Sequence, residues 1–369
     1  MKPFLLLFTL LFVFFVYVYL YQRVFRNKGS VSIPIASPQC NSLIFHLNTT
    51  VPILLIDPIL LEKIENGQCS DWQIYSKPIK IGVYVKYLSE HHLLEDSRFE
   101  VLFFTNDSKK DYLDFRTEPR RIIPKRFATH WVAQVEVPSN ISIFMGFWKR
   151  SKFVDCMNLY IPRNDTSVYL EPIRSTQALA NLCDELIDGG MFPYLNGGTL
   201  LGWYRECSVI PHTSDMDVAV SAENFNPEFV ETLDTNYSKF DLRRKFGMLN
   251  DSFQLTVSPR EGYRVFIDIF LMYKDVENGT DINYVGVLAP DGTKYKYTYP
   301  VYDPWCSADL HGHIFWVTCT PKEKLVKEYG PLWYRDHLSK YYSWKSSGKN
   351  VRRNGNFSKE QMKGVYYIY

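Results

Sequence analysis

The sequence has almost no net charge, because its 42 lysine and arginine residues are balanced by 40 aspartate and glutamate residues. The resulting formal net charge of +2 gives no electrostatic argument for nucleic acid as a partner. The chain also lacks internal repeats and low-complexity segments. With 369 residues, 46% of them hydrophobic, it can bury a core, and we expect two domains plus appendages.

Cysteine pairs of the CxxC type are absent, which argues against a structural zinc site. Disulfides are the alternative use of cysteine, but the odd count of seven leaves at least one unpaired within the chain. The connectivity cannot be deduced from the sequence. The seven residues are Cys40, Cys69, Cys156, Cys183, Cys207, Cys306 and Cys319.

Charged residues are also missing from Phe4 to Tyr21. As a helix this apolar segment would span roughly 27 Å, which is enough for one membrane crossing. No small-x-small motif follows it, so an uncleaved anchor is favoured over a cleaved signal peptide. We therefore predict a cytoplasmic tail at residues 1–3, a transmembrane signal anchor at 4–21 and a stem at 22–39.

Asn-x-Ser/Thr motifs indicate the side of the membrane on which the body lies. Eight are present, whereas chance predicts roughly two or three. This excess favours a lumenal body, a compartment in which disulfides also persist. The motifs start at Asn48, Asn106, Asn140, Asn164, Asn236, Asn250, Asn278 and Asn356.

Short apolar runs fill residues 40–160 and predict an α/β or mainly β amino-terminal domain, in which no catalytic constellation is visible. Residues 161–369 form the second predicted domain. There, Ser175 is a candidate cap for a helix that Gly189 and Gly190 end. Thr320 to Glu323 predict a capping box with proline at the first helical position, opening a helix that ends at Gly330.

The most informative stretch runs from Asn196 to Asp217. Asp215 and Asp217 alternate at the start of an apolar run, so on a β-strand both carboxylates point the same way. A third carboxylate, Asp268, lies in another apolar run that predicts a buried strand. A buried carboxylate is costly without a partner, and two or three on one face can hold a divalent cation.

A glycine turn precedes the paired aspartates. Gly197 and Gly198 let the backbone approach an oxyanion closely, while Thr199 and the amides at the helix start can donate hydrogen bonds to phosphate. Arg205, six residues after Thr199, can act as a bidentate phosphate donor. The plainer interpretations are an ordinary turn and a surface arginine.

The order of these features predicts metal-dependent phosphoryl chemistry. Asp215 and Asp217 would bind Mg²⁺ or Mn²⁺, and Asp268 would be either a third metal ligand or the base that accepts a proton from the acceptor hydroxyl. The competing interpretation is an exposed Asp-x-Asp strand with a salt-bridged Asp268. His311 and His313 have a spacing compatible with metal or acid–base work, but loop histidines more often do neither.

These motifs resemble those of a known family. GGTLLGWYREC followed by IPHTSDMDVAV is similar to the LicD group of nucleotidyltransferase-fold proteins, and KEYGPLW with YSWKSSGKNVRRNG resembles its fukutin-like branch. The resemblance is strongest from about Cys183 to Gly355. Many LicD-type proteins carry extra acidic residues directly before Asp-x-Asp, where this chain has residues 212–214, HTS. The number of metal ions therefore stays open.

The resemblance implies an α/β (α+β) protein whose nucleotidyltransferase-fold catalytic domain has a mixed sheet, preceded by the amino-terminal domain and a single transmembrane helix. It implies transfer of a phosphorylated alcohol, with ribitol 5-phosphate favoured, from a CDP-activated donor such as CDP-ribitol or CDP-choline. The acceptor would be a glycan of the protein O-mannosyl type on a glycoprotein. The expected location is the Golgi membrane, as a single-pass type II protein with a lumenal catalytic domain, in complex with other glycan-modifying enzymes.

Three other functions compete with this hypothesis. One is a phosphocholine transferase acting on glycans. A second is a nucleotide-sugar glycosyltransferase, which uses Asp-x-Asp but needs neither the glycine turn nor a third strand aspartate. The third is a non-catalytic Golgi partner of another transferase.

Overall fold

The computed structural model describes residues 51–68, 78–94, 97, 99–163, 167–301 and 305–369. The expected anchor at 4–21 and stem at 22–39 lie outside the described residues. Within those ranges, no helix is both long and apolar enough to cross a membrane. The chain divides into two compact units, one of residues 1–104 and 126–146 and the other of residues 105–125 and 147–369.

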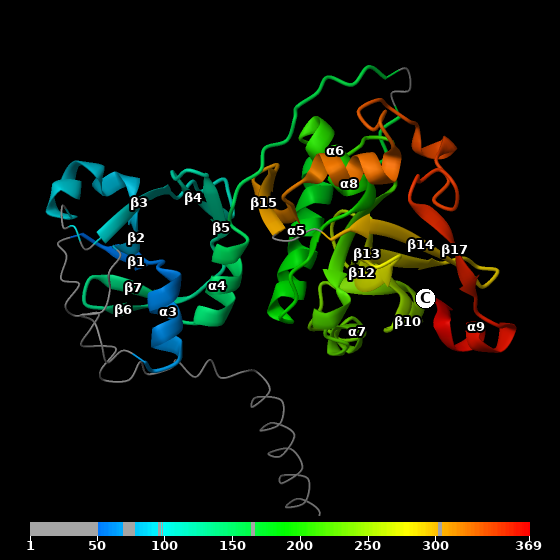
Figure 1. Ribbon diagram of the computed structural model, residues 1–369, viewed down its shortest axis with the longest axis horizontal. Coiled ribbons are helices and arrows are strands. Elements are labelled where there is room, and N and C mark those ends of the chain that lie inside the picture. The colour runs from blue at the N-terminus through cyan, green and yellow to red at the C-terminus, as the bar shows by residue number, and fades with distance from the viewer. Residues whose placement is uncertain (1–50, 69–77, 95–96, 98, 164–166, 302–304) are drawn as a thin grey trace, which may run out of the picture. The chain divides into compact units, whose positions relative to one another are not determined.

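The amino-terminal unit contains helices and a mixed sheet, in agreement with an α/β arrangement (Figure 1). Its strands lie in the order β3-β2-β1-β7-β6. The pairs β2–β3 and β1–β7 are parallel, and the pairs β1–β2 and β6–β7 are antiparallel. The elements are β1 (Ile53–Leu55), α3 (Pro58–Glu65), β2 (Ile79–Tyr84), η2 (Val85–Leu94), β3 (Phe99–Thr105), β6 (Thr129–Val132), β7 (Val135–Pro138) and α4 (Ile141–Lys149), which continues into the second unit.

The second unit includes a hairpin that the sequence placed in the amino-terminal domain. Strands β4 (Tyr112–Phe115) and β5 (Arg121–Pro124) pair with each other and belong to the second unit, as does the chain from residue 147 onward. The expected boundary at residue 160 therefore falls inside a compact unit.

The second unit is built on a large mixed sheet with the order β15-β16-β8-β9-β12-β11-β10-β18. Strand β13 pairs with β12 and β14, and β14 pairs with β17. The parallel pairs are β8–β16 and β9–β12. The strands are β8 (Tyr194–Leu195), β9 (Asp215–Ser221), β10 (Phe240–Met248), β11 (Asp251–Pro259), β12 (Phe266–Glu277), β13 (Thr280–Leu288), β14 (Thr293–Pro300), β15 (Trp305–Leu310), β16 (His313–Thr318), β17 (Val351–Asn356) and β18 (Tyr366–Ile368).

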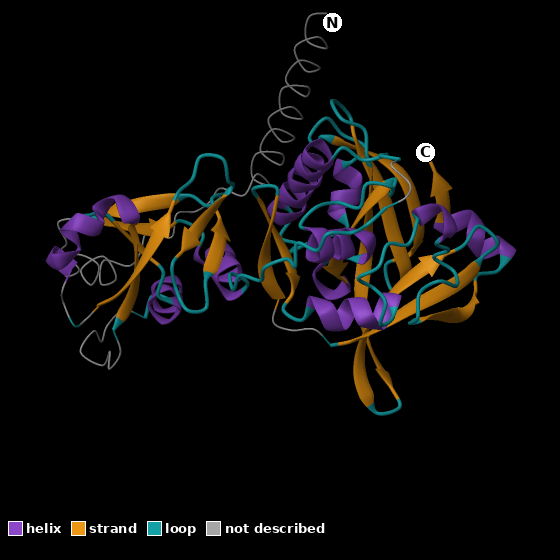
Figure 2. Cartoon of the chain, turned by 90° about the horizontal axis from the view of Figure 1, so that it is seen from above, coloured by secondary structure: helices purple, strands orange, loops and turns teal. Residues whose placement is uncertain are grey.

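Helices pack against the strands of this unit (Figures 1 and 2). Apolar residues of α5, α6 and α8 join those of the central strands in one core, which includes Leu179, Leu200, Val218, Ile267 and Leu325. This core holds the two strands that carry the aspartates. The helices are α5 (Pro172–Asp188), α6 (Gly197–Glu206), η3 (Ala222–Asn224), α7 (Glu228–Thr232), α8 (Pro321–Tyr329), η4 (Ser339–Tyr341) and α9 (Lys359–Val365).

One predicted helix start and one predicted helix cap need correction. Helix α5 begins at Pro172 rather than after Ser175, because the Glu171 carboxylate accepts hydrogen bonds from the Ile173 and Arg174 amides. Proline at the first position loses no hydrogen bond, since that amide has no partner within the helix. Helix α8 has the predicted bounds, but the Thr320 side chain makes no capping hydrogen bond.

Candidate active site

The aspartates predicted from the sequence lie together on two neighbouring strands. Strands β9 and β12 run parallel, with Asp217 opposite Asp268 and Asp215 opposite Phe266. Because facing residues in adjacent strands project to the same side, all three carboxylates share one face of the sheet. One ligand oxygen from each of Asp215, Asp217 and Asp268 lies within 4.8 Å of the others. The structure therefore forms a three-carboxylate cluster.

The glycine turn between β8 and α6 forms two hydrogen bonds with Asp217. The Gly198 amide donates to Asp217 Oδ2 at 2.9 Å, and the Thr199 hydroxyl accepts from the Asp217 amide at 2.7 Å. Gly197 has φ +47°, and a Cβ there would come within 2.7 Å of Asp217 Oδ2. A side chain at Gly197 would therefore displace the carboxylate.

These contacts give the glycine turn a role that the sequence did not predict. The sequence suggested that Gly197 and Gly198 let the backbone approach a phosphate and that Thr199 and the following amides donate to it, whereas in the structure the Gly198 amide donates to the Asp217 carboxylate and the Thr199 hydroxyl accepts from the Asp217 amide. The positive end of the α6 dipole thus faces a carboxylate of the cluster. The turn positions a candidate metal ligand directly.

Threonines orient the other two carboxylates. The Thr213 hydroxyl donates to Asp215 Oδ1 at 3.0 Å, and the Thr256 hydroxyl on β11 donates to Asp268 Oδ1. Neither threonine was singled out from the sequence as a site residue. The opposition of Thr256 and Asp268 across β11 and β12 requires knowledge of the strand register.

Burial and mutual repulsion disfavour the charged forms of the cluster. Burial, followed by the charges of Asp215 and Asp268, raises the pKa of Asp217 well above its ordinary value. Burial raises the pKa of Asp268 to about 7, against an opposing hydrogen bond from Thr256. In the described part of the chain, no lysine or arginine forms an ion pair with these carboxylates.

This donor set fits a hard divalent cation. Mg²⁺ and Mn²⁺ prefer carboxylate oxygens, and a cation would offset the repulsion that the charged cluster otherwise carries. Asp215, Asp217 and Asp268 are the residues that would hold it. Both a third-ligand role and a proton-accepting role for Asp268 are compatible with this geometry.

Without a divalent cation, we expect stability to fall as the pH rises from about 4 to about 8. The folded-state pKa of Asp268, about 7, exceeds its ordinary value of 3.8, so the folded protein keeps a proton that the unfolded chain has released. This stabilisation is complete below the ordinary pKa and is lost as the pH passes through 7. Because the side chain is partly exposed, solvent limits the effect to about 1–3 kcal/mol.

Thermal unfolding in EDTA across this pH range measures the effect. Asp268→Asn should lack the component that titrates near pH 7, so the difference between wild type and variant isolates it. Addition of Mn²⁺ should flatten the wild-type curve, because the cation replaces the proton. A wild-type protein that becomes more stable than Asp268→Asn as the pH rises would contradict this assignment.

A buried lysine forms a hydrogen bond with the residue that precedes the glycine turn. Asn196 precedes α6 but does not cap it, and its side-chain oxygen accepts a hydrogen bond from Lys324 Nζ. Lys324 is 1% exposed, and its ammonium lies 4.5 Å from the centroid of the Tyr299 ring. Burial lowers the pKa of Lys324 to about 8, while the charges of Glu328 and Asp217 oppose this shift.

Sequence reasoning missed this lysine because charged residues on a helix are usually assigned to solvent. The available signal was the i, i+4 spacing of Lys324 and Glu328, which places them one turn apart on the face of α8 next to Leu325; all three are buried. The Tyr299 hydroxyl donates to Glu328 Oε2 at 2.8 Å, so both charges have partners.

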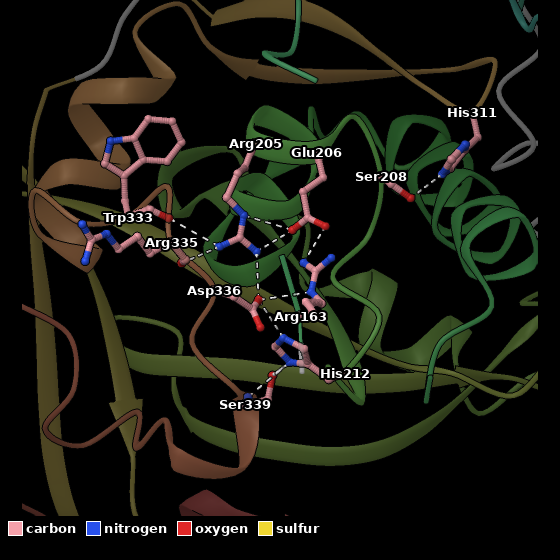
Figure 3. A network of polar contacts seen from close by, with 10 residues as sticks. All are labelled: Arg163, Arg205, Glu206, Ser208, His212, His311, Trp333, Arg335, Asp336 and Ser339. Carbon is pink, nitrogen blue, oxygen red and sulfur yellow. Dashed lines mark hydrogen bonds and ion pairs between the residues drawn. The ribbon is translucent and has the colours of Figure 1, made fainter. Parts of the chain in front are cut away.

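Arg205 has a different role from the one predicted. Its guanidinium is 2% exposed and donates to the Glu206 carboxylate and to the Trp333 and Arg335 carbonyls (Figure 3). These contacts tie the end of α6 to the segment after α8. The donors that were expected to bind phosphate therefore form internal hydrogen bonds. The sequence did not show that the side of α6 that carries Arg205 is buried.

The same network fixes the loop that leads into β9. Asp336 Oδ1 accepts from Arg163 at 3.2 Å and lies 3.1 Å from His212 Nε2, while His212 Nδ1 accepts the Ser339 amide at 3.2 Å (Figure 3). His212 is three residues before Asp215. Here it anchors the loop that ends at Thr213 and Asp215.

The two loop histidines lie outside the carboxylate cluster. His311 Nε2 lies 3.0 Å from the Ser208 hydroxyl, and His313 Nδ1 lies 2.8 Å from Asp111 Oδ2. Trp203 is buried, in agreement with a packing role, and donates through Nε1 to the Asp309 carbonyl.

Two disulfides link segments of the second unit. Cys156 pairs with Cys207, the residue at the carboxyl end of α6, and Cys306 pairs with Cys319 across the β15–β16 hairpin. Cys183 is buried in α5. Cys40 and Cys69 lie outside the described residues.

Two family profiles match the chain. Residues 39–155 match the family described as W02B3.4-like, N-terminal domain. Residues 190–320 match the LicD/FKTN/FKRP nucleotidyltransferase domain. The second match contains the glycine turn and all three aspartates.

Similar full-length proteins occur in Caenorhabditis elegans. Uncharacterized protein W02B3.4 is 56% identical over 383 residues, covering 100% of this chain and 97% of the relative. Uncharacterized protein T07A5.1 is 47% identical over 339 residues, covering 90% and 88%. Ribitol-5-phosphate transferase FKTN of Mus musculus is 27% identical over 246 residues, covering 63% of this chain and 50% of that protein.

Proposed function

The chain belongs to the family of the Caenorhabditis elegans protein W02B3.4 and carries a LicD/FKTN/FKRP nucleotidyltransferase domain, and we propose that it transfers a phosphorylated alcohol from a CDP-activated donor to a glycan. Ribitol 5-phosphate is the favoured alcohol, because the mouse relative is a ribitol-5-phosphate transferase. The acceptor is a glycan of the O-mannosyl type on a glycoprotein.

The observation that carries this proposal is the three-carboxylate cluster. Asp215, Asp217 and Asp268 converge within 4.8 Å, beside Gly197, at which a Cβ would come within 2.7 Å of Asp217 Oδ2. Structural aspartates can form ion pairs instead, but these three form none within the described residues. Such an arrangement suits a cation that is itself bound to substrate phosphates.

We propose Mg²⁺ or Mn²⁺ as the cofactor, which when bound would neutralise the donor diphosphate and orient it. Asp215 and Asp217 would hold the cation, each fixed by a neighbouring hydrogen-bond donor. Fixed ligands reduce the reorganisation required during reaction.

The reaction exchanges one phosphorus–oxygen bond for another. The acceptor hydroxyl oxygen forms a bond to the phosphorus that bears the alcohol, and the anhydride bond to CMP breaks, so CMP leaves with the bonding electrons. The hydroxyl proton goes to Asp268 if that residue acts as the base. A pKa of about 7 for Asp268 suits proton acceptance near neutral pH.

We further propose the Golgi lumen as the location, with residues 4–21 as a type II anchor. The two disulfides of the second unit support an oxidising compartment. Sequon asparagines with exposed side chains support entry into the secretory pathway. These are Asn106, Asn140, Asn236, Asn250, Asn278 and Asn356.

Release of CMP tests the transferase directly. The purified full chain should release CMP from CDP-ribitol in the presence of a glycan acceptor and Mn²⁺ or Mg²⁺, and EDTA should stop the release. CDP-glycerol and CDP-choline are the comparison donors, and turnover of CDP-choline alone would identify a phosphocholine transferase. Lack of turnover of all three donors with every glycan tested would overturn the proposed activity.

A further inference from the structure

A row of polar side chains extends from the carboxylate cluster across four strands. Asp217 on β9 faces Asp268 on β12, Asp268 faces Thr256 on β11, and Thr256 faces Arg244 on β10. Facing residues project to the same side of a sheet, so Arg244 lies on the face that carries the carboxylates. The guanidinium and the cluster are therefore on the same face of the sheet.

Arg244 extends from its own strand back toward the cluster. Its guanidinium carbon lies 5.8 Å from the centroid of the Phe266 ring, which is on β12, two strands away. Phe266 faces Asp215 and is two residues from Asp268, so its ring is also on the cluster side. The ring is 46% exposed, unusual for a phenylalanine on a central strand.

Arg244 lacks the carboxylate partner that the adjacent Arg243 has. Arg243 pairs with Asp241 at 3.0 Å, and the Lys245 ammonium lies 5.0 Å from the Tyr367 ring. The described residues provide no side-chain hydrogen bond or ion pair for the Arg244 guanidinium. Its charge nevertheless lowers the pKa of Asp268, in opposition to the dominant effect of burial, so it acts at the cluster without neutralising it.

A cation beside three carboxylates that forms no ion pair with them remains available to an anion. A metal-bound diphosphate would lie over the carboxylates and present further charged oxygens toward its surroundings. An arginine guanidinium offers planar, paired N–H donors that match phosphate oxygens. The Phe266 ring beneath the guanidinium holds it in place.

We propose that Arg244, supported by Phe266, is the diphosphate-binding arginine of this site and that its ligand class is a nucleoside diphosphate. This inference rests on the proposed function and adds a residue to it. Arg244 donates to the phosphate that leaves as CMP and takes up part of the charge that develops when the anhydride bond breaks. It replaces Arg205, which is occupied elsewhere.

Binding of CDP in the presence of Mn²⁺, measured by titration calorimetry on the full chain, tests the proposal. Arg244→Gln should weaken CDP binding roughly 10- to 100-fold, the range for loss of a charge-assisted hydrogen bond. Arg244→Lys keeps the charge and fold but loses the paired donors, so its affinity for CDP should lie between those of wild type and Arg244→Gln. Affinity for cytidine, which has no phosphate, should not change in either variant.

Lys245→Gln is the matched control. It removes one positive charge from the adjacent position of β10, and because side chains alternate along a strand, that charge lies on the opposite face. CDP affinity should stay within about twofold of wild type, as expected for a partly exposed charge away from the site. Equal losses in Lys245→Gln and Arg244→Gln, or wild-type CDP binding by Arg244→Gln, would overturn the proposal.

The outcomes separate this inference from the proposed activity. If wild type and Arg244→Gln turn over a CDP-alcohol equally well, the arginine assignment falls and the transferase stands. If CDP binding depends on Arg244 but no CDP-alcohol is turned over, the diphosphate site stands and the transferase falls. A wild-type protein that does not bind CDP with Mn²⁺ overturns the assignment.

Discussion

Asp217→Asn is expected to lower CMP release by about 10²- to 10³-fold, while making the metal-free protein more stable at neutral pH. Activity falls because one oxygen ligand of the proposed cation is lost. Stability rises because the pKa of Asp217 is raised by burial and by its two neighbours, so asparagine removes a disfavoured charge. The side-chain oxygen of the asparagine can still accept the hydrogen bond from the Gly198 amide. A gain in stability with a loss of activity is typical of functional residues.

Three measurements test this pair of effects: CMP release, Mn²⁺ affinity and thermal unfolding in EDTA. Asp281→Asn, at an exposed position of β13, is the control because it removes the same charge away from the cluster. It should leave all three quantities unchanged. If the protein is a non-catalytic partner of another enzyme, the Asp217→Asn variant would keep its cellular role. If metal-free Asp217→Asn is less stable than metal-free wild type, the electrostatic argument is contradicted.

Gly197→Ala is expected to impair the site as severely, through geometry instead of charge. The new Cβ would lie 2.7 Å from Asp217 Oδ2, so the carboxylate must move. The backbone at φ +47° adds about 1–2 kcal/mol of strain for a residue with a side chain. We expect a loss of stability together with a loss of Mn²⁺ affinity of at least about tenfold, the lower range for disturbed support of a metal ligand.

Substitutions at two other glycines distinguish the effect of backbone strain from the effect of displacing the Asp217 carboxylate. Gly262 has φ +79° with no atom within 4 Å of the point that a Cβ would occupy, so Gly262→Ala should cost similar stability without changing Mn²⁺ affinity. Gly198→Ala would place its Cβ at an ordinary 3.5 Å from Asp217 Oδ2, so affinity should be retained. If Gly197→Ala binds Mn²⁺ as tightly as Gly262→Ala does, the turn does not position the carboxylate.

The local pattern of the sequence was sufficient to predict the carboxylate cluster. Alternation placed Asp215 and Asp217 on one face of a strand, and the apolar residues around Asp268 predicted a second, buried strand that carries it. The segment after Pro259 joins β11 to β12 as an antiparallel pair. The mixed α/β architecture that the family resemblance implied is confirmed.

Contacts that depend on register or on buried charge could not be predicted in this way. Thr256 and Arg244 align with Asp268 across three strands, and β10 has irregular pairing between Leu242 and Arg244, which shifts the register. Lys324 and Arg205 have charged side chains that simple patterning assigns to solvent, whereas both are buried. The hydrogen bonds from Lys324 to Asn196 and from Arg205 to Arg335 each join residues more than a hundred positions apart in the chain.

The position of Lys324 also determines how much of the chain an excised catalytic domain must contain. The LicD/FKTN/FKRP match covers residues 190–320 and therefore ends just before α8. A protein trimmed to that range would keep every carboxylate but would leave the Asn196 side chain without its buried ammonium partner. The autonomous folding unit is accordingly longer than the recognisable domain, and limited proteolysis should yield a stable fragment that extends through Tyr329 and beyond.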